Sequence, residues 1–106
     1  TMSVLHLNET DFEAKINASP VAIVDFWASW CGPCRMLAPT IEKLGEEIEG
    51  KAVVGKVDVD ENQNLAGKFG VMSIPTVIVF KNGKEVARKV GVQPAPVYKE
   101  LLNSNL

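Results

Sequence analysis

The chain has 106 residues, which suits one domain spanning residues 1–106, and we expect no second domain. Apolar residues make up 46% of the chain, charged residues 23%, and the formal net charge is −2, so the composition favours neither nucleic acid nor a membrane as a partner. The sequence shows no export signal and no apolar run long enough to span a membrane, and we therefore expect a cytoplasmic protein.

The chain begins with a short strand candidate, residues 3–6, followed by a helical pattern over residues 8–17. Apolar residues four positions apart give this second segment one buried face. Asn8 and Thr10 are residue types that cap the start of a helix. The pattern therefore predicts a short amphipathic helix directly after the first strand.

The next two elements are predicted to be a buried strand and a long helix. Residues 21–28 are almost continuously apolar, which suits a strand that is covered on both faces and lies at the centre of a sheet. Residues 33–48 carry apolar side chains at helical spacing, and we expect Pro39 to kink this helix. Cys31 and Cys34 then lie at its N-terminal end.

A second β-rich run covers residues 52–59, and a short helical segment follows at about residues 62–69. A βαβ crossover is the natural connection between the strands at 21–28 and 52–59. These two strands are therefore predicted to be parallel neighbours or near neighbours in one sheet.

The last third of the chain predicts a hairpin and a helix. Residues 75–80 and 84–91 flank a turn that contains Asn82 and Gly83, a strong signal for two antiparallel strands. Pro94 and a second proline two positions later open the final helix. The residues of this helix that we expect to face the core are Val97, Leu101 and Leu102. Together the elements predict an α/β fold with a mixed sheet and helices on both faces.

Cys31 and Cys34 are the only cysteines and are separated by Gly32 and Pro33. Two cysteines without an export signal do not resemble the framework of a disulfide-rich secreted domain. Half of a zinc site is one alternative, but His6 is the only histidine available to complete it. A structural staple is another, and so short a loop would gain little stability from a disulfide.

Reversible dithiol–disulfide exchange is the alternative that we favour. One thiolate attacks a substrate disulfide, and the second thiol displaces the product from the resulting mixed disulfide. Unpaired N–H groups and the dipole at the helix start would stabilise a thiolate at Cys31. Cys34, inside the first turn, is the better candidate for the less exposed resolving thiol. Because Gly32 and Pro33 carry no charge, we expect moderate stabilisation of the thiolate and a dithiol that acts as a reductant.

Several motifs together resemble those of one family. The cysteines stand in WCGPC, preceded by FWA and followed by MSIPT at residues 72–76 and VG at residues 90–91. In this combination the chain resembles the thioredoxin family nearly from end to end. The resemblance implies the thioredoxin fold, with a single mixed central sheet of about five strands flanked on both faces by about four helices. It also implies general protein-disulfide reduction, electron transport and a part in cell redox homeostasis.

The resemblance also implies roles by position. Cys31 is then the nucleophile, Cys34 the resolving thiol, Asp25 a buried carboxylate and Lys56 its neighbour, and Pro75 is a cis-proline beside the disulfide. The substrate-binding residues are then Trp30, Gly32, Pro33, Ile74, Pro75 and Gly91. No metal and no bound cofactor are implied besides the redox-active disulfide. The implied partners of the monomer are client proteins with disulfides and a thioredoxin reductase that draws on NADPH.

Two pairs of residues allow further interpretation. Asp25 lies in the most apolar run, where burial should raise its pKa, and Lys56 alternates so that it could share the same sheet face. The pair is either a buried ion pair or a site where Asp25 accepts the proton of Cys34. Trp27 is read as core packing, whereas an exposed Trp30 would provide contact area for peptide substrates.

Two rival functions remain. The chain could be a binding module that uses the same apolar patch while its thiols are incidental. It could also be an oxidase or isomerase of an oxidising compartment, although the missing export signal and the uncharged Gly32-Pro33 pair argue against that function.

Overall fold

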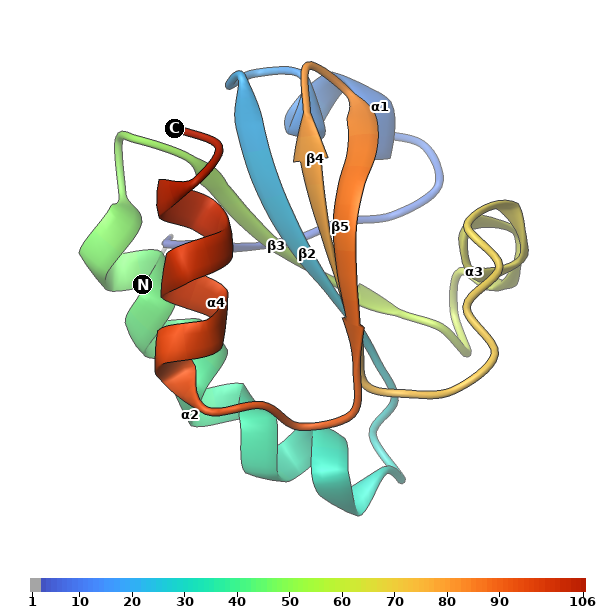
Figure 1. Cartoon of the computed structure of the whole chain (residues 1–106). Coiled ribbons are helices and arrows are strands. Elements are labelled where there is room, and N and C mark those ends of the chain that lie inside the picture. The colour runs from blue at the N-terminus through green and yellow to red at the C-terminus, as the bar shows by residue number, and fades with distance from the viewer. Residues whose placement is uncertain (1–2) are drawn as a thin grey trace.

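Five strands form one mixed sheet in the computed structural model, which describes residues 3–106. Their order across the sheet is β1-β3-β2-β4-β5 (Figure 1). The strands are β1 (Val4–His6), β2 (Val21–Trp27), β3 (Val53–Asp58), β4 (Thr76–Lys81) and β5 (Lys84–Val90). β1, β3 and β2 are parallel, whereas β4 is antiparallel to both β2 and β5. The predicted mixed sheet is therefore confirmed, with the continuously apolar strand β2 at its centre.

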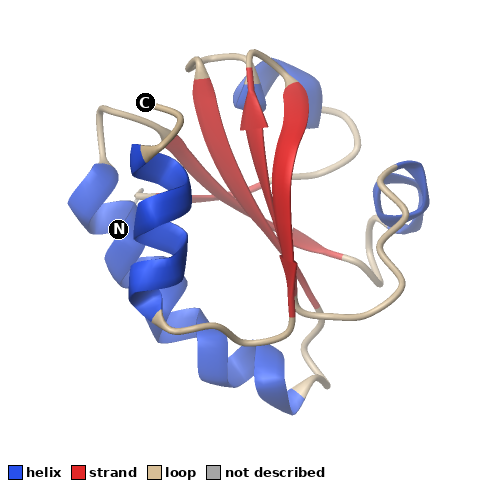
Figure 2. Ribbon diagram, in the orientation of Figure 1, coloured by secondary structure: helices blue, strands red, loops and turns tan. Residues whose placement is uncertain are grey.

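Helices cover both faces of the sheet, as the sequence predicts. Within residues 3–106 they are α1 (Phe12–Ile16), α2 (Gly32–Ile48), α3 (Gln63–Lys68) and α4 (Ala95–Asn103). α2 and α4 lie against one face and α1 and α3 against the other (Figures 1 and 2). α2 connects the parallel strands β2 and β3, which confirms the predicted βαβ crossover.

The central strand β2 contributes side chains to two apolar layers. Ile23 packs with Leu37 of α2 in the cluster under α2 and α4. Val24 packs with Phe12 of α1 in the cluster on the other face. Because successive residues of a strand face opposite sides, Asp25 lies on the face that α2 and α4 cover. The alternation of one strand thus places a carboxyl group under the helix that carries both cysteines.

The hairpin between β4 and β5 has the geometry that its sequence predicts. Asn82 and Gly83 both have positive φ angles, 51° and 80°, as a two-residue type I′ turn requires. The Asn82 N–H donates to the carbonyl of Pro20 at 2.7 Å and so ties the turn to the start of β2. A Cβ atom at position 83 would lie 2.6 Å from the side-chain oxygen of Asn17, so the exposed Asn17 side chain would have to move aside for any other residue.

The first helix is shorter than predicted, because the chain ahead of it forms a turn. The side-chain oxygen of Asn8 accepts the N–H groups of Thr10 and Asp11, at 2.8 and 3.0 Å. Asp11 then stands at the N-cap, and α1 has only five residues. The prediction that Asn8 and Thr10 cap the helix is wrong, because asparagine can close a turn on its own backbone just as well.

The final helix buries a residue that sequence analysis missed. Leu102 is buried as predicted, Leu101 packs partly against the same cluster, and Val97 is only half-buried. Tyr98, one turn ahead of Leu102, is completely buried, and its hydroxyl oxygen accepts the N–H of Gln93 at 3.1 Å. The core face of α4 is therefore displaced by one residue from the predicted one.

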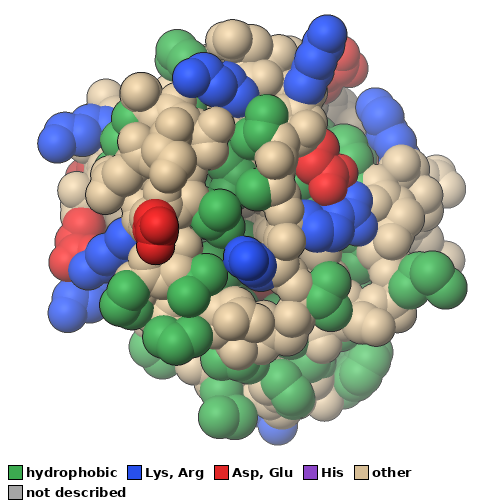
Figure 3. Space-filling view, in the orientation of Figure 1, with side chains coloured by type: hydrophobic (Ala, Val, Ile, Leu, Met, Phe, Trp, Pro, Cys, Tyr) green, Lys and Arg blue, Asp and Glu red, His purple; other side chains and the backbone are tan. Residues whose placement is uncertain are grey.

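The face of the molecule seen in Figure 3 differs in character between its lower and upper parts. Figure 3 shows apolar side chains gathered in the lower part of the view, around the N-terminal end of α2, whereas charged side chains are frequent in the upper part. None of the helices within residues 3–106 is long and apolar enough to cross a membrane. The single-domain prediction also covers residues 1 and 2, which lie outside the described residues.

Candidate redox site

The site is built at the start of α2, where Cys31 and Cys34 form a disulfide. Cys31 is the N-cap residue, and its sulfur accepts the N–H of Cys34 at 3.2 Å. Gly32 and Pro33 form the first two helical positions, where a proline costs nothing because those N–H groups have no partner in the helix. Local sequence thus places both sulfurs at the positive end of a helix of 17 residues.

Exposure does not distinguish the two sulfur-bearing residues. Cys31 is 4% exposed and Cys34 is 3% exposed in the disulfide form. The expectation that Cys34 is the more hidden thiol therefore gains no support from burial. The positions do differ, since Cys31 follows the exposed Trp30 and Cys34 lies inside the first turn of α2.

A loop from the far half of the chain completes the site. The Cys31 sulfur lies 3.8 Å from the carbonyl oxygen of Ile74. The Ile74–Pro75 peptide bond is cis, as the family resemblance implies. The N–H of Gly91 donates to the carbonyl of Pro75 at 2.8 Å, and Gly91 has a φ of 86°, which favours glycine. The structure therefore places Ile74 beside the disulfide and joins Gly91 to the Ile74–Pro75 segment.

An apolar rim borders the disulfide. Trp30 is 66% exposed, as expected, and its indole N–H donates to a carboxylate oxygen of Asp60 at 2.8 Å. Met36 and Met72 are also exposed and lie in the segments that carry Cys34 and Ile74. Sequence analysis missed Asp60, because no local pattern signals a hydrogen bond between residues 30 positions apart.

Asp25 is a buried carboxyl group without a hydrogen bond. It is 1% exposed, and neither side-chain oxygen has a hydrogen-bond partner. Burial raises its pKa from 3.8 to about 7, and the positive charge of Lys56 opposes this rise only in part. The sequence-based expectation of a raised pKa is confirmed. Asp25 therefore exchanges a proton near neutral pH.

Lys56 is the neighbour of Asp25, but the two do not form an ion pair. They are register partners in the parallel pair of β2 and β3. Lys56 is 9% exposed, and its ammonium nitrogen lies 4.7 Å from the centroid of the Trp27 ring. The buried ion pair considered from the sequence is therefore wrong. Trp27 is half-buried, and its indole N–H is buried without a hydrogen-bond partner.

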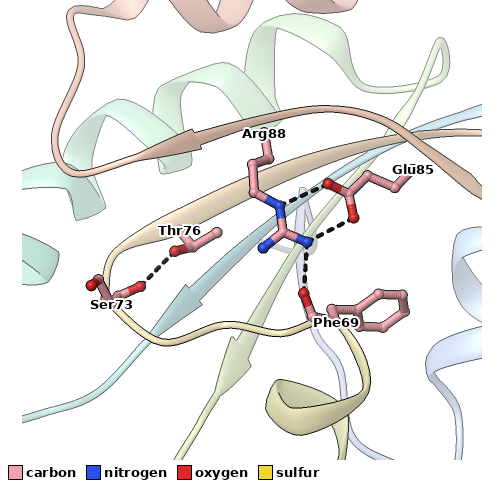
Figure 4. Close-up of polar contacts among 5 residues, drawn as sticks. All are labelled: Phe69, Ser73, Thr76, Glu85 and Arg88. Carbon is pink, nitrogen blue, oxygen red and sulfur yellow. Dashed lines mark hydrogen bonds and ion pairs between the residues drawn. The ribbon is translucent and has the colours of Figure 1, made fainter.

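A polar contact outside the site holds the loop that carries Ile74 (Figure 4). The guanidinium of Arg88 donates to both carboxylate oxygens of Glu85, at 2.7 Å each, and to the carbonyl of Phe69 at 2.6 Å. This ion pair lowers the pKa of Glu85. At the other end of the loop, the hydroxyl of Thr76 donates to the carbonyl of Ser73. Both ends of residues 69–76 are therefore tied down.

The cysteine pair decides the chemistry of the site. Among residues 3–106, no group of three or more His, Cys, Asp or Glu side chains is arranged to hold a metal ion. What the geometry provides is a sulfur pair that can pass between dithiol and disulfide at a helix start, which makes the chain a thiol–disulfide oxidoreductase.

The family model for thioredoxin matches residues 3–104. The chain belongs to the thioredoxin family, and Cys31 and Cys34 are its redox-active pair.

Relatives extend over nearly the whole chain. A thioredoxin of Staphylococcus aureus (strain Mu50 / ATCC 700699) is 50% identical over 105 residues, which are 99% of this chain and 100% of that protein. The thioredoxin of strain MW2 matches to the same extent. A solved structure, a mutant thioredoxin from Halobacterium salinarum NRC-1, superposes with a TM-score of 0.89 at 40% identity and covers 96% of this chain and 89% of that one. The predicted thioredoxin fold is therefore confirmed.

Proposed function

We propose that the chain works as a monomeric, general protein-disulfide reductase of the cytoplasm, with Cys31 as its nucleophile. The observation that carries the proposal is the N-cap position of Cys31, whose sulfur accepts the N–H of Cys34 at 3.2 Å. A thiolate at this position would keep that hydrogen bond and lie at the positive end of the helix dipole. Since Gly32 and Pro33 add no charge, the stabilisation is moderate and the dithiol remains a reductant.

The reaction has two thiol–disulfide exchange steps. The Cys31 thiolate attacks one sulfur of a client disulfide, a Cys31–client disulfide forms, and the other client sulfur leaves as a thiolate. Cys34 then loses its proton and attacks the Cys31 sulfur. This second step closes the Cys31–Cys34 disulfide and releases the client as a dithiol, so that two electrons pass from this chain to the client.

Asp25 is proposed to accept the proton of Cys34, directly or through water. Its burial under α2 and its lack of hydrogen bonds support this role. So does its pKa of about 7, because a base that titrates near the working pH can both take up and release a proton. Lys56 adds a positive charge near the carboxylate without pairing with it.

The client is proposed to bind across the rim of the disulfide. Trp30 provides exposed apolar contact area, and Gly32, Pro33, Ile74, Pro75 and Gly91 complete the surface. The backbone of Ile74 borders the Cys31 sulfur at 3.8 Å. An extended client segment that pairs with this backbone would bring its own sulfur next to Cys31.

A thioredoxin reductase that draws on NADPH is proposed to return the disulfide to the dithiol, with no cofactor bound to this chain. The test is an equilibrium titration of the disulfide against reduced and oxidised glutathione, followed by an assay of NADPH consumption with reductase and a protein disulfide. A dithiol more reducing than glutathione is the expected result. A dithiol more oxidising than glutathione would favour the oxidase or isomerase function instead.

The double variant Cys31→Ser/Cys34→Ser separates the reductase from a binding module. A reductase loses all turnover and all cellular function with this change, because serine cannot form a disulfide. A binding module would keep its cellular function, since the exposed rim around Trp30 is untouched.

A further inference from the structure

Lys56 lies beside Asp25 in the sheet, but its ammonium group contacts a different partner. The two residues are register partners on β2 and β3 and face the side that α2 and α4 cover. The ammonium nitrogen lies 4.7 Å from the centroid of the Trp27 ring. Both carboxylate oxygens of Asp25 remain without a hydrogen bond. The buried cation is therefore placed over an aromatic ring although a carboxylate lies next to it.

The sheet places Trp27 where it can hold this cation. Trp27 follows Asp25 by two residues on β2 and so faces the same side. Its own register partner is Asp58, two residues after Lys56, so that the indole lies two register pairs further along the two strands and on the same face. The indole N–H is buried and makes no hydrogen bond. The indole contacts Lys56 through the face of its ring, and the face of an aromatic ring attracts a cation.

We propose that Trp27 is a positioning residue, which holds the Lys56 ammonium over its ring and so keeps Asp25 free to act as a base. The consequence for catalysis rests on the proposed role of Asp25 as proton acceptor. An ammonium group at hydrogen-bond distance would favour the ionised carboxylate and make it a poorer proton acceptor. Over the indole face, the cation keeps an attractive electrostatic contact and leaves the carboxylate unpaired.

The pH dependence of Asp25 also depends on the other titratable groups nearby. From the helices that cover this face come Cys34 of α2 and Tyr98 of α4, and the pKa of Tyr98 is raised mainly by its burial and further by the charge of Asp25. The Lys56 side chain lines a pocket of about 200 Å³. The titratable side chains that line this pocket besides Lys56 are His6, Asp58 and Glu61. Asp58 and Glu61 could also attract the Lys56 ammonium away from Asp25. The test must therefore separate their effect from that of Trp27.

The first test follows the carboxyl carbon of Asp25 by ¹³C NMR in the oxidised protein, where both cysteines are held as a disulfide. In Trp27→Leu, the freed ammonium should turn to Asp25 and move the Asp25 titration toward lower pH by about one pH unit or more. Trp27→Phe, which keeps a ring, should give a smaller change in the same direction. Glu61→Gln, a change in the same pocket but away from the ring, should leave the titration in place. An unchanged titration in Trp27→Leu, or an equal change in Glu61→Gln, would overturn the proposal.

A double variant shows whether the effect passes through the lysine. In Trp27→Leu/Lys56→Met no cation is left to pair with Asp25, so its titration should return to the original pH or above it. A titration that stays low would mean that loss of the indole acts through packing and not through Lys56.

If Trp27→Leu does not fold, the unmodified protein still decides the question, because Lys56 methylene protons near an indole face must show a ring-current shift to high field. A normal shift would overturn the proposal.

The kinetic test separates this proposal from the proposed function. The rate of product release from the mixed disulfide should fall about threefold in Trp27→Leu at high pH, because a weaker base accepts the Cys34 proton less readily. The rate should recover in Trp27→Leu/Lys56→Met. If the NMR titration moves but the release rate does not, Trp27 positions Lys56 as proposed and the role of Asp25 as proton acceptor is wrong.

Discussion

The guanidinium of Arg88 on β5 holds the carbonyl of Phe69, 19 residues earlier in the chain, at a distance of 2.6 Å. Phe69 is the residue that ends α3, and the loop after it leads to Ile74 beside the disulfide. A single side chain thus connects an edge strand of the sheet to the start of the loop over residues 69–76 (Figure 4).

Arg88→Ala should loosen this loop and weaken client binding. We expect a loss of about 1 kcal/mol in the free energy of unfolding and a higher KM for a protein disulfide with little change in kcat. Hydrogen exchange should become faster at Val71, whose N–H donates to Ala66 within the same turn. The matched control is Glu85→Gln, which removes an exposed ion pair and leaves the bond to Phe69. Equal effects of the two variants would show that the bond to Phe69 has no special role.

Asp25 should make the stability of the protein depend on pH. Its pKa is higher in the folded chain, about 7, than its ordinary value of 3.8, so the folded state holds this proton over the range between them. The free energy of unfolding should therefore fall as the pH rises through that range, by about 4 kcal/mol from this residue, and then level off. In Asp25→Asn this dependence should be absent, and the variant should be the more stable protein above neutral pH. Denaturant unfolding of both proteins at several pH values measures the difference.

The same variant should slow one step of the reaction. An amide cannot accept the proton of Cys34, so Asp25→Asn should lower the rate of product release near neutral pH while the first attack by Cys31 is unchanged. Single-turnover kinetics across pH resolves the two steps. A release rate equal to that of the unmodified protein at every pH would leave Asp25 with a structural role only.

Cys34→Ser should accumulate a stable mixed disulfide with a client protein. Cys31 can still attack, but no neighbouring thiol remains to release the product. Cys31→Ser should form no such adduct, because Cys34 lies inside the first turn of α2 and not at its N-cap. Mass spectrometry of the trapped species identifies the linked cysteine. Adducts on Cys34 at a comparable rate would reverse the roles of the two thiols.

The Asp60 carboxylate should help binding by holding the Trp30 indole, which donates to it at 2.8 Å. Asp60→Ala should raise the KM for a protein disulfide about threefold, the size of one modest surface hydrogen bond. Asp60→Asn keeps a side-chain oxygen that can accept the indole N–H, so its KM should remain close to the original. A raised KM in Trp30→Ala together with an unchanged KM in Asp60→Ala would show that the indole needs no such anchor.

Local patterns in the sequence predict the elements of this fold well. The continuous apolar run that forms β2 and the Asn82-Gly83 turn both depend on neighbours in sequence, and both are confirmed. The error in α4 arises because helical spacing alone leaves two choices. Val97 and Leu101 are four residues apart, and so are Tyr98 and Leu102, which are the pair that the fold buries.

The candidate site is less accessible from sequence, because its contacts join distant segments. The spacing of Cys31 and Cys34 predicts the chemistry, and family resemblance supplied Ile74, Pro75 and Gly91. Nothing local indicates that Asp60 bonds to Trp30. Alternation along β3 predicts the sheet face of Lys56, but the direction of a long flexible side chain depends on which partners the folded sheet brings within reach.

The pairing of β2 with β4 affects the order in which the chain acquires reactive thiols and a preference for protein clients. These neighbours in the sheet are separated in sequence by α2, β3 and α3, and their pairing brings the Cys31 segment to the Ile74 loop. A chain emerging from the ribosome therefore presents both thiols before the Ile74 backbone, proposed above to orient a client, has been synthesised. Contacts between distant segments also form late in folding, since closing long loops costs entropy. A fragment that ends after β3 should react with small disulfides like a simple dithiol and show no preference for protein clients.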